Sequence, residues 1–284
     1  MEILHYGKDV AELVKGWKAL DLAVALVPTM GALHDGHMRL VEKALEEADR
    51  VVVSIFLNPV QFNRGEDLDK YPRTPDEDLR KLEKAGVHCA FVPGIREIYP
   101  PGFSTKVTVS GLTEGLCGKY RPGHFDGVTT VCAILFGIVS PHVAVFGMKD
   151  AQQLAVVRRM VRDLRMGIGI VPCETVREPD GLAMSSRNAY LDREERAQAP
   201  VIYKALLAAR EAVKAGVGDA DAVKKLVEEK ISTADLAGIQ YVEVVDPDTM
   251  ERLETIESTA LLAVAVYFGD TRLIDNMILD ASGD

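Results

Sequence analysis

The 284-residue sequence lacks the features that define several large classes of protein. It has four cysteines, with no C-x-x-C pair and no zinc-ligand spacing, so we expect reduced, mostly buried thiols and not a disulfide scaffold. No apolar run reaches the ~18 residues that a membrane helix needs, and the N-terminus lacks the pattern of a signal peptide. These absences predict a cytoplasmic protein that does not interact with a membrane.

Basic charge is scarce as well. The sequence contains 33 Lys and Arg against 43 Asp and Glu, a formal net charge of −10. Sequence-independent binding to nucleic acid needs a basic surface, so we expect no nucleic-acid partner. A small basic pocket for phosphate is still compatible with this balance. The P-loop, the dinucleotide-binding fingerprint and the G-x-S-x-G elbow are all missing.

What is present is an alternation of strand-like and helix-like segments, followed by a change of rhythm near Val176. Strands are expected at 22–28, 51–57, 89–92, 142–146 and 168–171, with helices at 36–48, 75–84, 126–139 and 150–165. After the change, helices are expected at 192–215 and 219–234, and strands at 239–245, 260–267 and 271–279. The pattern predicts an α/β protein, with a Rossmann-like parallel sheet covered by helices on both faces in residues 1–176. Residues 177–284 are predicted to form a smaller α+β lid domain.

The most informative segment joins a strand to a helix and reads VPTMGALHDGH over residues 27–37. It places His34, Gly36 and His37 where a helix begins. A helix N-terminus offers N–H groups and partial positive charge to phosphate, and two histidines three residues apart can donate to phosphoryl oxygens. We therefore interpret this segment as a nucleotide site, while two ordinary capping histidines are the simpler alternative.

Three further polar segments are candidates for the same chemistry. FLNPVQF follows a predicted strand and contains Gln61, FGMKDAQQ joins a strand to a helix and contains Lys149, and MSSRN combines two hydroxyls with Arg187. Weaker candidates are Arg121, His124 and Asp126, where a structural ion pair is nearly as plausible as a substrate contact. Asp76 and Asp78 could hold Mg²⁺ or simply stabilise a helix start.

The H-x-G-H element resembles that of the nucleotidylyltransferase superfamily, and longer strings resemble one family within it, the pantoate–β-alanine ligases (pantothenate synthetases). These strings run in order over nearly the whole chain: VPTMGALHDGH, FLNPVQF, YPRTPDEDL, RPGHFDGV, VAVFGMKDAQQ, MSSRN and TRLIDN. The resemblance implies ATP- and Mg²⁺-dependent condensation of (R)-pantoate with β-alanine. The implied products are pantothenate, AMP and diphosphate, formed through a pantoyl-adenylate. A homodimer is also implied.

The resemblance also implies roles for individual residues. Catalysis is assigned to His34, His37, Lys149 and Arg187. Pantoate is assigned to Gln61 and Gln153, β-alanine to Gln61, and no residue is a direct metal ligand. The implied ATP contacts are Met30, Gly31, Ala32, Leu33, His34, Asp35, Gly36, His37, Gly147, Met148, Lys149, Asp150, Val176, Met184, Ser185, Ser186 and Arg187. Met148 replaces a charged or polar residue of the family, and residues 63–71 are the candidate lid over the site.

Two other functions are open at this point. Another H-x-G-H enzyme could transfer a nucleotide to a phosphorylated acceptor, but the pair Gln61 and Gln153 favours pantoate. A non-catalytic nucleotide-binding protein would not need the full set His34, His37, Lys149 and Arg187. A tRNA synthetase is disfavoured by chain length and by the acidic charge.

Overall fold

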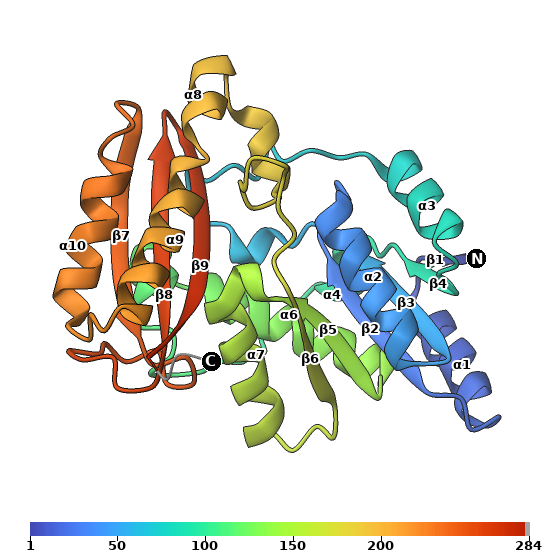
Figure 1. Cartoon of the computed structure of the whole chain (residues 1–284). Coiled ribbons are helices and arrows are strands. Elements are labelled where there is room, and N and C mark those ends of the chain that lie inside the picture. Colours follow the sequence, from blue (N-terminus) through green and yellow to red (C-terminus); the bar gives the residue numbers. More distant parts are fainter. Residues whose placement is uncertain (282–284) are drawn as a thin grey trace. The chain divides into compact units, whose positions relative to one another are not determined.

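A computed structural model describes residues 1–281 and divides the chain into two compact units (Figure 1). The first comprises Met1–Val109, Arg121–Met148 and Val156–Glu174. The second comprises Ser110–Tyr120, Lys149–Ala155 and Thr175–Asp284. Two short segments that precede residue 156 therefore group with the C-terminal part. The two domains predicted from the sequence, residues 1–176 and 177–284, stay a prediction.

The first unit contains a six-stranded parallel sheet of order β1-β4-β3-β2-β5-β6. Its strands are β1 (Glu2–Leu4), β2 (Val24–Thr29), β3 (Arg50–Ile55), β4 (Cys89–Phe91), β5 (Val143–Gly147) and β6 (Gly169–Cys173). Its helices are α1 (Gly7–Lys18), α2 (Asp35–Glu47), α3 (Pro75–Lys84), α4 (Ile95–Ile98) and α6 (His124–Val139), with a 3₁₀ turn η1 (Pro59–Gln61). The turn η2 (Met148–Asp150) and helix α7 (Ala151–Asp163) contribute residues to both units. The predicted parallel α/β sheet is confirmed.

The central strands are apolar and β-branched because helices cover both faces of the sheet. Residues 24–27 of β2 and 51–53 of β3 are fully buried. On one face they pack with Val41 and Ala44 of α2 and with Leu82 of α3. Helices α1 and α6 pack against each other and against β2. Such continuous apolar runs are typical of strands buried on both faces.

The strand order reverses between β2 and β5. From β2 the chain continues outward to β3 and β4, whereas from β5 it continues in the other direction to β6. Open α/β sheets bind ligands beyond the carboxyl ends of the strands at such a switch point. The residues that follow β2 and β5 are Met30 and Met148, so two of the predicted segments flank this position.

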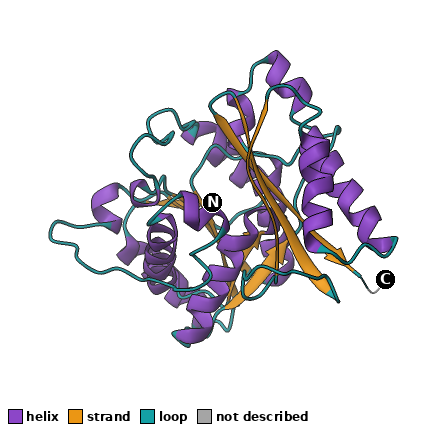
Figure 2. Ribbon diagram, turned by 90° about the vertical axis from the view of Figure 1, so that its left-hand side faces the viewer, coloured by secondary structure: helices purple, strands orange, loops and turns teal. Residues whose placement is uncertain are grey.

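The second unit is an antiparallel sheet of order β7-β8-β9 with helices packed on it. Its elements are α5 (Leu116–Tyr120), η3 (Ser186–Tyr190), α8 (Arg193–Gln198), α9 (Val201–Lys214), α10 (Ala220–Ile231), β7 (Ala237–Val245), β8 (Thr259–Phe268) and β9 (Thr271–Asp280). Helices α9 and α10 lie along the sheet and share its apolar core (Figure 1). The three strands are long and twisted (Figure 2). The predicted α+β composition of this part is confirmed.

One predicted helix is wrong in extent. Residues 192–215 form two helices, α8 and α9, and not one, because Pro200 lacks the N–H that a continuous helix would need. The predicted capping box is present, since Asp192 accepts from Glu195 N–H and the Glu195 side chain accepts from Asp192 N–H. Strand β1 and helix α1 were not predicted. A three-residue strand carries no periodicity, but α1 has apolar residues at helical spacing, with Val10 and Val14 buried, so its pattern was overlooked.

The four cysteines are unpaired and buried, as predicted. Burial raises the pKa of Cys89 and Cys132 to about 12, which keeps both thiols protonated and unreactive. Within residues 1–281, no helix is long and apolar enough to cross a membrane.

Candidate active site

The turn after β2 has an unusual backbone. Gly31 and Ala32 both have positive φ, 85° and 52°. A Cβ on Gly31 would lie 3.1 Å from Ile55 and 3.2 Å from the carboxylate of Asp78. Glycine is therefore required at this position by both conformation and space. The turn leads directly into α2, which begins at Asp35.

The two histidines of the H-x-G-H element are anchored to the backbone through the same ring atom. His34 Nδ1 accepts from the N–H of Gly36 at 3.1 Å, and His37 Nδ1 accepts from the N–H of His34 at 3.3 Å. Backbone N–H groups can only donate, so each Nδ1 is unprotonated and each neutral ring carries its proton on Nε2. The ring centroids are 4.1 Å apart. The pair can donate two N–H groups to neighbouring phosphoryl oxygens.

These contacts refine the expectation that the start of α2 offers its backbone to phosphate. The Gly36 N–H already donates to His34, so the ring replaces it as a donor to a ligand. The two interpretations of the histidines are therefore compatible. The rings cap the start of the helix through Nδ1 and present Nε2–H groups to a ligand.

Asp78 is the main residue near this turn whose role the sequence left open. It lies in the first turn of α3 and is 1% exposed. Its carboxylate accepts from the N–H groups of Ala32 and Leu33, both at 2.8 Å, and from the Thr74 hydroxyl at 3.0 Å. Both oxygens are therefore engaged by the protein itself. The spacing of acidic residues at the start of a helix does not indicate that Asp78 contacts a turn 46 positions earlier in the sequence.

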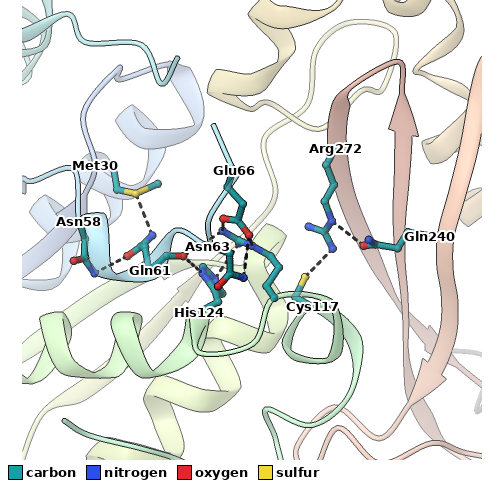
Figure 3. A network of polar contacts seen from close by, with 10 residues as sticks. Met30, Asn58, Gln61, Asn63, Glu66, Cys117, His124, Gln240 and Arg272 are labelled. Carbon is teal, nitrogen blue, oxygen red and sulfur yellow. Dashed lines mark hydrogen bonds and ion pairs between the residues drawn. The ribbon is translucent and has the colours of Figure 1, made fainter. Parts of the chain in front are cut away.

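A second polar network orients Gln61 (Figure 3). Asn58 is 1% exposed, and its Oδ1 accepts from Val60 N–H at 3.2 Å and from the Tyr99 hydroxyl at 2.9 Å. Its Nδ2 donates to the Gly127 carbonyl at 3.1 Å and to Gln61 Oε1 at 3.0 Å. Because the backbone groups fix which end of the Asn58 amide is oxygen, Gln61 must turn its own oxygen toward Asn58.

The amide nitrogen of Gln61 is therefore the end presented as a donor, and it contacts the sulfur of Met30 at 3.1 Å. The backbone carbonyl of Gln61 accepts from His124 Nδ1 at 2.8 Å. A carbonyl only accepts, so His124 is protonated on Nδ1, the reverse of His34 and His37. His124 thus supports the segment that carries Gln61.

The weaker candidates Arg121 and Asp126 form structural ion pairs. Arg121 donates to the carboxylate of Glu66 at 2.8 and 2.5 Å, and Asp126 pairs with Lys106 at 2.6 Å. Burial alone would raise the pKa of Glu66, but the hydrogen bond and charge of Arg121 outweigh burial and lower it. Arg121 therefore holds the candidate lid segment 63–71 to the start of α6.

In the second unit, the TRLIDN segment positions Lys149. The side chain of Asn276 donates to the carbonyl of Lys149 at 2.8 Å. The neighbouring Asp275 accepts two hydrogen bonds from Arg177, at 2.6 and 3.0 Å. Burial raises the pKa of Asp275, and Arg177 offsets only part of that effect. Asp275 and Asn276 belong to the TRLIDN string of the resemblance, which assigned neither of them a role.

The MSSRN segment follows a narrow backbone loop in the same unit. Met184 N–H donates to the Val176 carbonyl at 3.0 Å, which brings two predicted ATP contacts opposite each other. Ser185 caps η3 by accepting from the Arg187 N–H at 3.3 Å. A small pocket is lined by Lys149 and Ser185 among others. Of the two neighbouring glutamines, Gln152 is buried and donates to the carbonyls of Leu112 and Gly115, whereas Gln153 is half-buried.

A parallel sheet with a histidine pair at its switch point defines a nucleotide-dependent α/β enzyme of the H-x-G-H type. The sequence matches the family described as Pantoate-beta-alanine ligase over residues 2–278, and the chain belongs to this family of ligases.

Individual relatives agree with the family match. The pantothenate synthetase of Acetivibrio thermocellus is 49% identical over 280 residues, covering 99% of this chain and 100% of the relative. That of Enterococcus faecalis is also 49% identical, with 99% of each chain covered. The crystal structure of pantothenate synthetase from Thermus thermophilus has a TM-score of 0.92 at 45% identity, covering 98% of this chain and 99% of that one.

A further structure was solved with ligands bound. The pantoate–β-alanine ligase of Francisella tularensis, complexed with β-γ ATP and β-alanine, has a TM-score of 0.81 at 32% identity. The alignment covers 98% of this chain and 97% of that one.

Proposed function

We propose that this chain joins (R)-pantoate to β-alanine with ATP, giving pantothenate, AMP and diphosphate. The observation that carries the proposal is the histidine pair at the switch point, where backbone N–H groups hold both Nδ1 atoms and so place the ring protons on Nε2. Family membership over residues 2–278 supports the substrates, and the ligands of the Francisella structure are consistent with them.

In the first step a carboxylate oxygen of pantoate attacks the α-phosphorus of ATP. Diphosphate leaves, and pantoyl-adenylate forms. The reaction concentrates negative charge on phosphoryl oxygens, so fixed donors and cations lower the barrier. We assign the Nε2–H groups of His34 and His37, Lys149 and Arg187 to this task, with Ser186 as a further donor.

The remaining ATP contacts follow the predicted set. Val176 and Met184 hold the adenine side, and Ser185, Gly147, Met148 and Asp150 contribute near the phosphates. Since the N–H groups of Ala32 and Leu33 donate to Asp78, contacts at these two residues use other atoms. Met30, Gly31, Asp35 and Gly36 complete the set along the turn, and at Gly36 the contact likewise uses atoms other than the N–H, which donates to His34.

We assign the Gln61 amide N–H to an oxygen of pantoate, because Asn58 occupies the amide oxygen. Gln153 is the second pantoate contact, and β-alanine binds near Gln61. In the second step the neutral amine of β-alanine attacks the acyl carbon of the adenylate. AMP leaves with the carboxylate oxygen that attacked phosphorus, and the amine proton passes to an acceptor or to water.

Mg²⁺ belongs to this proposal as a group bound to the phosphates. Among residues 1–281, no cluster of three or more His, Cys, Asp or Glu is arranged for a metal ion. Mg²⁺ bound to phosphates usually keeps several waters, and Asp150 beside Lys149 would hold one of these waters. When bound, the ion would neutralise phosphate charge. Asp78 does not suit this role, because its oxygens are already engaged.

Two broader expectations are also proposals. We infer a cytoplasmic location, which the four buried, unpaired thiols support. We infer a homodimer from the family resemblance, and sedimentation velocity of the purified protein tests it.

The function is tested by mixing purified protein with Mg-ATP, pantoate and β-alanine and measuring AMP and pantothenate by mass spectrometry. Both products should appear only when both acids are present. ATP binding without either product would contradict the proposal and favour nucleotide transfer to a phosphorylated acceptor, the alternative with the same H-x-G-H element.

A further inference from the structure

Asp78 has the contacts of a residue that shapes the nucleotide turn without reaching a substrate. It comes from α3, yet its carboxylate accepts both N–H groups of the peptide units at Ala32 and Leu33. With 1% of its surface exposed, the side chain is not available to solvent. The Thr74 hydroxyl supplies a third donor at 3.0 Å and directs the carboxylate toward the turn.

The backbone around these contacts has the geometry of an anion site. Successive N–H groups converge where a residue takes a left-handed conformation, and Ala32 has a φ of 52°. A left-handed alanine is strained and needs support from its surroundings. In this protein the convergent N–H groups hold an internal carboxylate, so the turn is stabilised before any ligand arrives.

Helix α3 holds the same turn at a second point. Lys81 Nζ donates to the Leu33 carbonyl at 2.5 Å and also pairs with Glu77 at 2.8 Å. One helix therefore supplies an acceptor for two N–H groups and a donor for one carbonyl of the turn. His34 follows Leu33 directly, so these contacts set where the H-x-G-H element begins.

We propose that Asp78 is a positioning residue for ATP, acting by filling the anion-binding turn at Ala32 and Leu33 with a protein carboxylate. Two effects follow. The turn takes the conformation that presents His34 and His37, and the internal negative charge directs the triphosphate toward the histidines and away from the Ala32 and Leu33 amides. The inference rests on the proposed placement of ATP at residues 30–37.

The test compares Asp78→Asn with Glu83→Gln, an equal loss of charge at an exposed position of the same helix. Asparagine keeps one acceptor but turns an NH₂ group toward a backbone N–H, so one of the two contacts is lost. Thr74→Val is a milder variant that removes only the hydroxyl donor to Asp78. Each protein is assayed for the KM of ATP and of β-alanine, for kcat, for thermal midpoint, and for binding of a non-hydrolysable ATP analogue by calorimetry.

We expect Asp78→Asn to raise the KM for ATP and weaken analogue binding about tenfold or more, the usual effect of losing a charge-assisted hydrogen bond. The KM for β-alanine should stay within about twofold. Thr74→Val should raise the KM for ATP as well, but by a smaller factor than Asp78→Asn. A purely structural role would lower kcat with the folded fraction and leave both KM values unchanged.

Equal effects of Asp78→Asn and Glu83→Gln, or unchanged ATP binding in a folded Asp78→Asn protein, would overturn the inference. If Asp78→Asn does not fold, the KM for ATP and the analogue affinity of Thr74→Val test the inference instead, and unchanged values would overturn it. A wild-type protein that binds the analogue but makes no pantothenate contradicts the proposed function alone, since the calorimetric comparison of the variants still tests Asp78.

Discussion

The ambiguous side chains of this site are oriented by backbone groups that can only donate or only accept. His34 and His37 each face a backbone N–H with Nδ1, whereas His124 faces a carbonyl. Gln61 is oriented one step further away, through Asn58. At the residue scale, the fold therefore decides which atoms of these residues can donate to a substrate.

Nitrogen-15 NMR of histidine-labelled protein tests this directly. We expect neutral His34 and His37 with the proton on Nε2, and neutral His124 with the proton on Nδ1, because of their backbone contacts. His34→Ala and His37→Ala spectra provide the assignments. A proton on Nδ1 of either His34 or His37 at neutral pH would contradict the account, since it would oppose a backbone N–H.

Tyr99 orients the Gln61 amide through Asn58, and burial raises the pKa of Tyr99 to about 12, so its hydroxyl stays a donor near neutral pH. Tyr99→Phe removes one of two donors to Asn58 Oδ1, a loss of about 1 kcal/mol. We expect a several-fold higher KM for pantoate and little change in the KM for ATP. Tyr6→Phe, at an exposed tyrosine, is the control. An unchanged KM for pantoate would show that Val60 alone suffices to orient Asn58.

At the scale of elements, helix α6 approaches the turn η1 so closely that only glycine fits between them. A Cβ on Gly127 would lie 2.7 Å from both the N and the Cα of Gln61. Gly127→Ala should therefore displace Gln61, destabilise the protein by about 1–3 kcal/mol and raise the KM for pantoate.

The matched control for this prediction is Gly137→Ala in the same helix. A Cβ there meets nothing within 4 Å, so the substitution should stabilise the helix by up to about 1 kcal/mol without changing kinetics. Chemical denaturation and steady-state assays measure both variants. Equal behaviour of the two alanines would mean that the close approach does not position Gln61.

The ion pair between Glu66 and Arg121 should make the segment 63–71 sensitive to acid. Glu66 has a lowered pKa in the folded protein, because the hydrogen bond and charge of Arg121 outweigh the effect of burial. Its stabilising contribution is complete above the unfolded pKa of about 4.3 and is lost as pH falls through the lower folded value. Hydrogen-exchange protection in 63–71 should fall over that range.

Glu66→Gln is the control for this pH dependence, since it removes the titrating group and keeps the shape. Its protection factors should be lower at neutral pH and should change less on acidification. The same acid-induced loss in both proteins would assign the effect to other carboxyl groups.

The sequence predicted most of the long, periodic elements well, with helix α1 the exception, and the short or proline-interrupted ones poorly. The central strands and helices of the first unit are close to their predicted limits, because a continuous apolar run or a 3.6-residue period identifies each of them. The helix expected at 192–215 is divided at Pro200, and the short helices α4 and α5 had no pattern strong enough to predict.

At the scale of the whole molecule, the sequence located the residues that carry the chemistry but not the supporting residues that lie far from them in sequence. Motifs following strands are found by reading the chain, which is how His34, Gln61 and Lys149 were identified. Asp78 and Tyr99 act across 46 and 41 positions of sequence. Contacts over such separations depend on how strands and helices pack, so one sequence gives no local signal for them.

The central claim is that a pantoate carboxylate oxygen attacks the α-phosphorus of ATP and later leaves with AMP. The most direct measurement uses pantoate labelled with ¹⁸O in its carboxylate, together with Mg-ATP and β-alanine, and analyses AMP by mass spectrometry. The account predicts one ¹⁸O in each AMP, with pantothenate retaining the other labelled oxygen. AMP without label, or ADP as the nucleotide product, would contradict it.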